Sequence, residues 1–195
     1  MALWGTSDAD ESKPKNLTTA EKKEVFANNS GWVREAGSIL SGNGNTGADP
    51  EVLVAVSGLA DSIGAADVTE VEWITTLADR SAGYTMSVRV RWNEAVTVTG
   101  NPTLAVTNGN QGSGSGRGPH TLVYASGSGS NELVFNLAIG AANAATKVDD
   151  VLVIGAQTIA LAGGTIKDTA DGTTVSARAI SGAQGTAAGG VTVVA

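Results

Sequence analysis

The chain has 195 residues, a length that suits one ordinary domain with an extension or two small modules. Its net charge of −7 argues against nucleic-acid binding, and its lack of cysteine excludes disulfides, thiolate metal sites and cysteine nucleophiles. Apolar residues make up 42% of the chain and aromatic residues only 4%, so the core must consist mainly of Val, Leu, Ile and Ala. We expect no secretory signal, because residues 1–15 lack a basic region followed by an apolar stretch, and no membrane span, because no apolar run approaches about 18 residues.

The first third of the chain lacks a strand period and carries most of the excess acid. Residues 1–69 hold ten acidic and five basic side chains. Residues 1–17 mix charge with isolated apolar side chains, and we expect them to form an extended tail that becomes ordered only on a partner. The sequence therefore predicts an extended, partly helical N-terminal arm, residues 1–68, that binds a partner.

One short helix is expected within this arm. Thr18 and Glu21 have the spacing of a capping box, and residues 22–27 are good helix material with Val and Phe as their apolar members. The letters NNSG that follow are a stop signal. Residues 32–40 fit either a helical turn or a strand, and the apolar run 52–56 fits a strand.

From about residue 69 the apolar residues alternate with polar ones, as they do in half-buried strands. The clearest alternation places five large side chains on one face: Tyr84, Met86, Val88, Val90 and Trp92. Glycine-rich turns separate further candidate strands at 71–77, 97–99, 103–107, 120–125, 132–139, 151–154, 158–161, 174–179 and 191–194. Short strands at a spacing of about 8–12 residues predict an all-β sandwich over residues 69–195.

Candidate catalytic and metal-binding residues are few. His120 is the only histidine, and a strand-edge or loop contact explains it better than a catalytic role, because no motif aims a nucleophile at it. Asp168 and Asp171 could supply oxygens to Ca²⁺, but they lack the EF-hand spacing and also suit turns, which we favour. Arg89 and Arg91 form a basic strip on one strand face, where pairing with Glu across a sheet is the expected role. We therefore expect no catalytic residue, no cofactor and no metal.

The four tryptophans divide into two pairs. Trp73 and Trp92 occupy inward positions of predicted strands and should belong to the core. Trp4 and Trp32 lie in the polar arm, where an indole either enters a pocket on a partner or folds back to cap the sandwich. Tryptophan is enriched at binding hot spots, so we favour the partner. The expected partner-contact residues are Trp4, Lys13, Lys15, Phe26, Trp32 and Arg34.

Three segments of the body resemble bacterial Ig-like domains. Residues 87–104, SVRVRWNEAVTVTGNPTL, are similar to the opening pattern F/W-x-E-x-V-x-V-x-G-x-P-x-L of that family. The later YASGSG at 124–129 with ELVF at 132–135, and GTIKD at 164–168, resemble its two following motifs. The match covers roughly residues 70–180. The resemblance implies an Ig-like β-sandwich that serves as an adhesive or spacer module without catalysis.

A second resemblance concerns the N-terminus. The letters MALWG at 1–5, KPK at 13–15 and GWVREAGS at 31–38 are similar to the start of virion structural proteins from marine, cyanobacteria-infecting tailed phages. This resemblance implies a capsid decoration or cement protein in the virion, made in the host cytoplasm and anchored to the major capsid protein through its arm.

Several alternatives remain open at this point. A tail, neck or fibre component is the first, and a polysaccharide-degrading virion enzyme is a distant second. A homo-oligomer and weak binding to the host surface are compatible with either structural role. Nucleic acid and membrane are not expected partners.

Overall fold

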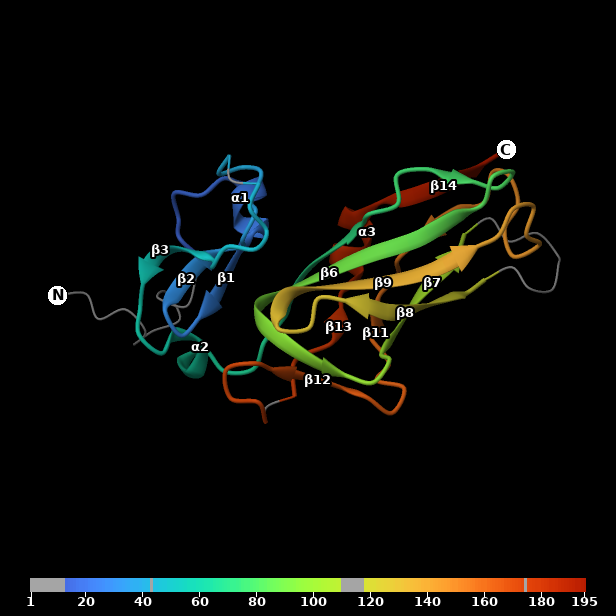
Figure 1. Ribbon diagram of the computed structural model, residues 1–195. Coiled ribbons are helices and arrows are strands. Elements are labelled where there is room, and N and C mark those ends of the chain that lie inside the picture. Colours follow the sequence, from blue (N-terminus) through green and yellow to red (C-terminus); the bar gives the residue numbers. More distant parts are fainter. Residues whose placement is uncertain (1–12, 43, 110–117, 174) are drawn as a thin grey trace.

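The computed structural model describes residues 13–42, 44–109, 118–173 and 175–195, and strands dominate it (Figure 1). The expected all-β class is confirmed. The first elements are α1 (Thr19–Lys23), β1 (Val25–Asn28), β2 (Gly31–Arg34), β3 (Glu51–Ala55) and α2 (Leu59–Ser62). The strands that follow are β4 (Val68–Trp73), β5 (Ala78–Asp79), β6 (Tyr84–Thr99), β7 (Thr103–Asn108), β8 (His120–Ser126), β9 (Ser130–Ile139), β10 (Val151–Val153), β11 (Gln157–Thr158), β12 (Thr165–Asp168) and β13 (Ala179–Ile180). The chain continues with α3 (Gly182–Ala188) and β14 (Gly190–Val194).

Most strands of the described residues belong to one large sheet. Its order is β3-β2-β1-β6-β9-β8-β7-β10-β14-β5, with β4 and β12 also paired to β6, while β11 and β13 form a separate small sheet. The long strand β6 is the hub, because it pairs with β9 along one edge and with β4 and then β12 along the other. The C-terminal strand β14 pairs with β10 and β5, so it completes the chain's own sheet.

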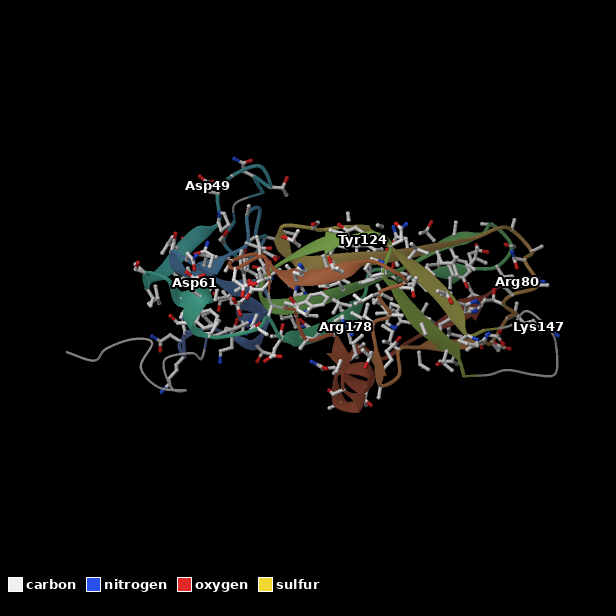
Figure 2. The ribbon with its side chains drawn as sticks, turned by 90° about the horizontal axis from the view of Figure 1, so that it is seen from below. Asp49, Asp61, Arg80, Tyr124, Lys147 and Arg178 are labelled. Carbon is white, nitrogen blue, oxygen red and sulfur yellow. The ribbon has the colours of Figure 1, made fainter. Side chains whose placement is uncertain are left out.

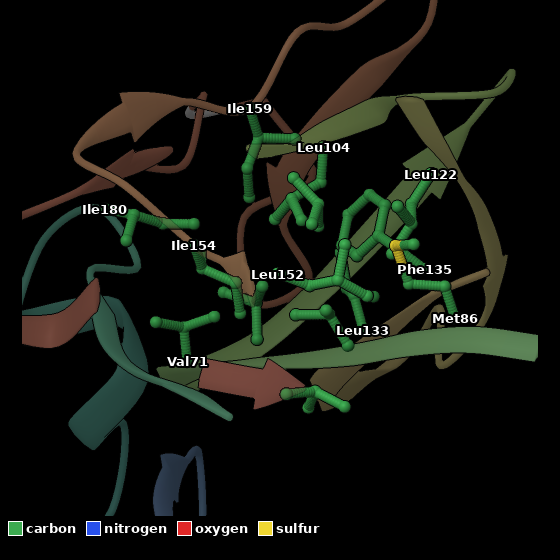
Figure 3. Close-up of a cluster of buried hydrophobic side chains, with 14 of the residues drawn as sticks. Val71, Met86, Leu104, Leu122, Leu133, Phe135, Leu152, Ile154, Ile159 and Ile180 are labelled. Carbon is green, nitrogen blue, oxygen red and sulfur yellow. The ribbon is translucent and has the colours of Figure 1, made fainter. Parts of the chain in front are cut away.

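The body of the protein, residues 66–195, is built around the alternation that the sequence predicts. Met86, Val88, Val90 and Trp92 of β6 are all fully buried. Apolar side chains from β4, β7, β8, β9 and β10 meet them in one cluster, together with Ile159 and Ile180 (Figure 3). Trp73 packs at the margin of this core as expected, whereas Leu77 is exposed, because regular pairing of β4 ends at Trp73.

The N-terminal segment is a folded unit from Lys13 onward, which corrects the expectation of an extended arm. We call residues 13–63 the N-terminal module. The strands β1, β2 and β3 form an antiparallel meander, and β1 joins β6 through a single parallel pair, Ala27 with Glu94. A small core of its own holds the module together, with Val25, Ala27, Trp32 and Leu59 at its centre. Residues 1–12 lie outside the described part of the chain.

The helix α1 has the predicted capping box but ends earlier than predicted. The Thr18 hydroxyl accepts a hydrogen bond from the Glu21 N–H, and the Glu21 carboxylate accepts one from the Thr18 N–H at 2.8 Å. The expected continuation through residues 22–27 is wrong, because Val25 and Phe26 belong to β1 and pair with Arg34 and Val33. A β-branched and an aromatic residue before a tight turn pack better in a hairpin than in a third helical turn.

Glycine is required where β2 meets β3. Gly31 has φ of 129°, and a Cβ on it would lie 2.0 Å from the carbonyl oxygen of Val54. The preceding turn is closed by Asn28, whose side-chain oxygen accepts the N–H of Ser30 at 2.8 Å. The letters NNSG thus encode a hairpin turn, and residues 31–34, left open by the sequence, form a strand.

The two ends of the molecule carry different units. Figure 2 shows Asp49 and Asp61 in the N-terminal module at one end, with Arg80 and Lys147 at the far end of the body. At that far end the Arg80 side chain donates to the carbonyl oxygens of Thr146 and Ala142, at 2.9 and 3.3 Å. The molecule is elongated, with the N-terminal module at one end and these loops of the body at the other (Figure 2).

Candidate functional site

Two of the aromatic residues that were expected to contact a partner are buried within the chain's own fold. Trp32 is 1% exposed at the centre of the module core, and Phe26 is 5% exposed. The expectation that these rings project into a partner is therefore corrected: the hairpin turns Trp32 onto Leu59, and the module supplies the pocket itself. Trp4, the third expected contact, lies outside the described residues.

The basic residues of the same prediction are distributed differently. Lys13 is half-buried and its ammonium donates to the carbonyl oxygen of Lys22 at 2.6 Å, while Lys15 is exposed. Arg34 forms ion pairs with Glu21 at 3.4 Å and Glu51 at 3.8 Å, and its side chain is only 11% exposed. Only Lys15, among the described residues of the prediction, presents its charge freely to a partner.

The surface of the module instead offers an open strand edge and an apolar loop. The strand β3 is an edge strand of the large sheet, so no described strand pairs with its outer edge. Val52 on β3 is 49% exposed, and the preceding loop carries Ile39 at 86% and Leu40 at 51%. An unpaired strand edge is a template for strand addition, and exposed apolar side chains on the same module offer a partner further contact area. We call β3 together with Ile39 and Leu40 the module edge.

A cluster of ion pairs lies where the module meets the body. Arg91 of β6 contacts Glu72 at 2.8 Å and Glu70 at 3.4 Å, and its Nε donates to Glu132 of β9. Lys23 of the module reaches Glu70 from the other side. The expected pairing of strand-face arginine with glutamate is thus confirmed, although Arg91 is buried because the module covers this face.

Burial at this junction shifts the pKa of two groups in opposite senses. Desolvation first, and then the charge of Glu132, raise the pKa of Glu35 to about 7. Desolvation and the nearby Arg91 guanidinium lower the pKa of Lys13 to about 8. A cavity of about 500 Å³ lies beside this cluster, lined by Glu35, Arg91 and the loop that precedes β3 among others. Both shifts move the pKa of these groups toward neutrality.

A second acidic site lies at the other side of the junction. Glu94 of β6 is 0% exposed, and its protonated carboxyl group forms a side-chain hydrogen bond with Asp168. Its carboxylate lies against that of Asp168, the last residue of β12, which is 2% exposed. We call Glu94 and Asp168 the acid pair. Burial, followed by the charge of Asp168, raises the pKa of Glu94 to about 8, and burial also raises the pKa of Asp168.

The sequence analysis did not predict this pair, although the sequence carries a signal for it. The inward positions of β6 continue from Trp92 through Glu94 to Val96, and all three are fully buried. Glu94 is therefore a carboxylate on an otherwise apolar face. In β12, Asp168 follows buried Ile166 in the same manner. A charged residue in phase with a buried apolar series indicates a paired or ligand-binding group.

The remaining candidate residues either accept hydrogen bonds within turns or are buried in the fold. Asp168 accepts the N–H of Ala170 at 2.7 Å, and Asp171 accepts the N–H of Thr173 at 2.8 Å, so the predicted turn chemistry is confirmed at both. His120 opens β8, is 5% exposed and has a pKa lowered by burial. No described group forms a hydrogen bond with its Nε2.

No family model, curated protein or solved structure matches the sequence. Among the described residues, no helix has the length and apolar character needed to span a membrane. The acid pair, the ion-pair cluster and the module edge are therefore interpreted from their own geometry.

Proposed function

We propose that this chain is a non-catalytic structural protein of a tailed-phage virion, a decoration or cement protein whose N-terminal module attaches it to the major capsid protein. The body is an Ig-like β-sandwich that projects from the attachment point. The observation that carries the proposal is the module edge: an open strand with exposed Val52, at one end of an elongated molecule.

The Ig-like assignment is supported by where the motif residues lie. The opening motif runs along β6 into β7, and its positions Trp92, Val96 and Leu104 are fully buried. Phe135, from the later motif, is also fully buried, and Tyr124 packs edge-on against it with ring centroids 6.3 Å apart. A motif whose apolar positions coincide with the core is a structural signature of a module rather than of a reacting centre.

Attachment through the module edge is supported by the chemistry of β3. Its letters EVLVA are rich in β-branched residues, and main-chain hydrogen bonds to an added strand supply affinity whatever the partner's sequence. Ile39 and Leu40, on the loop that precedes β3, add exposed apolar side chains to the same module. On a capsid lattice many copies bind at once, so a modest contact per copy is sufficient for a stable coat.

The test is reassembly on virions that lack the protein. Purified full-length chain is added to such particles, the particles are sedimented, and bound protein is quantified. Wild type should bind at a fixed copy number. The double variant Ile39→Asp, Val52→Lys should lose at least tenfold of this binding, because it places charge on both parts of the module edge. The matched control Val148→Lys changes a 45% exposed valine of the body and should bind as wild type.

The location of the bound protein separates the structural roles. Cryo-electron microscopy of the reassembled particles should show density on the capsid lattice; density on the neck, tail or fibres would replace decoration with the alternative role. Equal binding by the double variant would refute attachment through the module edge. Release of reducing ends from host polysaccharide by the purified chain would refute the non-catalytic assignment.

A further inference from the structure

The acid pair lies where the N-terminal module and the body are joined. Among the described residues, Glu94 is the one residue of β6 that pairs with β1, through Ala27. A cavity of about 200 Å³ lies beside this backbone pair, lined by Ala27 and Ala60 of the module and by Glu94 and Asp168 of the body. The strand link between the two units and the acid pair therefore share a residue, so a change in the charge of Glu94 acts directly on that link.

The surroundings of the pair favour one negative charge and oppose two. Glu94 and Asp168 are 0% and 2% exposed, and Glu94 continues the buried series of Trp92 and Val96. The protonated carboxyl group of Glu94 donates its hydrogen bond to Asp168, and no described N–H group bonds to the Glu94 oxygens. A second buried carboxylate without a donor would be costly, so the folded chain retains a proton between the two acids.

The neighbouring charges have the same effect. Asp67, before β4, and Asp171, after β12, add negative charge around Glu94, and Asp61 of α2 adds it around Asp168. Burial first, and then these charges, raise the pKa of Glu94 to about 8, whereas its ordinary value is 4.5. At neutral pH the folded chain therefore holds a proton that an opened junction, with both acids in water, would release.

We propose that the proton shared by the acid pair holds the N-terminal module against the body, and that loss of this proton at alkaline pH opens the junction between them. Once the proton leaves to solvent, two anions face each other beside a cavity whose alanine side chains cannot solvate them. Entry of water between the two units relieves this repulsion. The junction should open more easily as the pH rises from about 4.5 to 8 and no more easily above 8, because the closed state binds the extra proton only within that range.

The experiment measures this opening through one thiol placed in the full-length chain. The chain has no cysteine, and Ala60 is 3% exposed and lines the cavity, so the thiol of Ala60→Cys reacts when the two units separate. Its rate of reaction with dithiodipyridine is compared with that of a second chain that also carries Glu94→Gln, whose amide donates to Asp168 at every pH. The ratio of the first rate to the second should rise about tenfold per pH unit between pH 5 and 8 and stay level above pH 8.

Three further measurements complete the test. Asp168→Asn places an amide donor on the other side of the pair and should also keep the Ala60→Cys thiol protected at alkaline pH. Asp49→Asn alters an exposed carboxylate of the loop before β3 and should leave the reaction rate unchanged at every pH. The thiol of Val106→Cys, at a fully buried position of the body core, should stay unreactive over the same range, because only the junction opens.

Nuclear magnetic resonance of the side-chain carboxyl carbons reads the proton directly in the wild-type chain, so the proposal stays testable even where a variant fails to fold. The Glu94 resonance should titrate near pH 8, and titration near its ordinary value of 4.5 would overturn the proposal. A rate ratio that is constant with pH would overturn it too, as would a Val106→Cys thiol that becomes reactive together with that of Ala60→Cys. All these measurements use the free chain, so their outcome is independent of particle attachment and of the proposed function.

Discussion

Arg91 is the buried cation at the centre of the ion-pair cluster on the face of β6 that the N-terminal module covers. Its side chain is 6% exposed and contacts Glu70, Glu72 and Glu132. Arg89, two residues earlier on the same face, contacts Glu72 and Glu132 but keeps 30% exposure. The two arginines share partners and differ in solvation, so they form a natural matched pair for measuring what burial adds to an ion pair.

We predict that Arg91→Met lowers the free energy of unfolding by about 3 kcal/mol. Removing one partner of a buried ion pair costs about 3–5 kcal/mol, and the lower figure applies because the three carboxylates retain 21–29% exposure. Arg89→Met should cost about 1 kcal/mol or less, as exposed pairs do. Urea unfolding followed by tryptophan fluorescence measures both. Equal losses for the two variants would contradict the role assigned to burial.

At the scale of elements, the segment after β2 places Glu35 against β6 and β9. The pKa of Glu35, about 7, exceeds its ordinary value of 4.5, so the folded chain holds a proton that the unfolded chain has released. Its contribution to stability is therefore complete below pH 4.5 and is lost as the pH rises through about 7. Lys13 acts at higher pH: its lowered pKa favours the neutral form, so stability gains from it only above about pH 8.

Accordingly, Glu35→Gln should flatten the fall in unfolding free energy between pH 5 and 7.5. The measurement is urea unfolding at constant ionic strength across that range, with Glu51→Gln on β3 as the control for an exposed glutamate of the same module. Groups facing Glu35, namely Glu24, Glu132 and Arg91, stay unchanged in the variant. A wild-type minus variant difference that is constant with pH would show that Glu35 does not titrate in this window.

The sequence predicted the elements that depend on local pattern and missed those that depend on distant partners. The alternation in β6 and the capping box of α1 are encoded within a few residues, and both are confirmed. The strand β1 was missed, because Val25 and Phe26 become a strand only through pairing with residues of β2. The seven-residue helix α3 was missed as well, since its Gly- and Ala-rich letters resemble a loop apart from the cap of Ser181 and Gln184.

The candidate site residues likewise depend on contacts between residues that are distant in the sequence. The acid pair joins residues that are 74 positions apart, and only the phase of Glu94 in the buried series of β6 hinted at it. The expected role of Trp32 depended on the arm having no core, whereas Leu59, 27 residues later, supplies one. Long-range packing that one sequence does not reveal decided both outcomes.

At the scale of the whole molecule, the described residues form two separate apolar cores, one in the module and one in the body. The module core and the body core share no buried residue, and one parallel pair with the surrounding ion pairs links their strands. Among the described residues, the module core is centred on four buried side chains and the body core contains 21. Local opening free energies follow the buried apolar contact that each unit holds, so the module should open more readily than the body.

Native-state hydrogen exchange of Leu59→Ala tests this division. Leu59 is 1% exposed in the module core, and its truncation should lower the opening free energy of β1 and β2 by about 2–4 kcal/mol, or about 30- to 1,000-fold in exchange rate. Amides of β6 and β9 should exchange as in wild type, because their core is untouched. The control Leu104→Ala truncates a fully buried side chain of the body and should accelerate exchange in both units, since an opened body exposes the strand edge on which β1 rests. If Leu59→Ala instead speeds β6 and β9 as much as β1, the two cores unfold as one cooperative unit, and the module is not an independently opening attachment element.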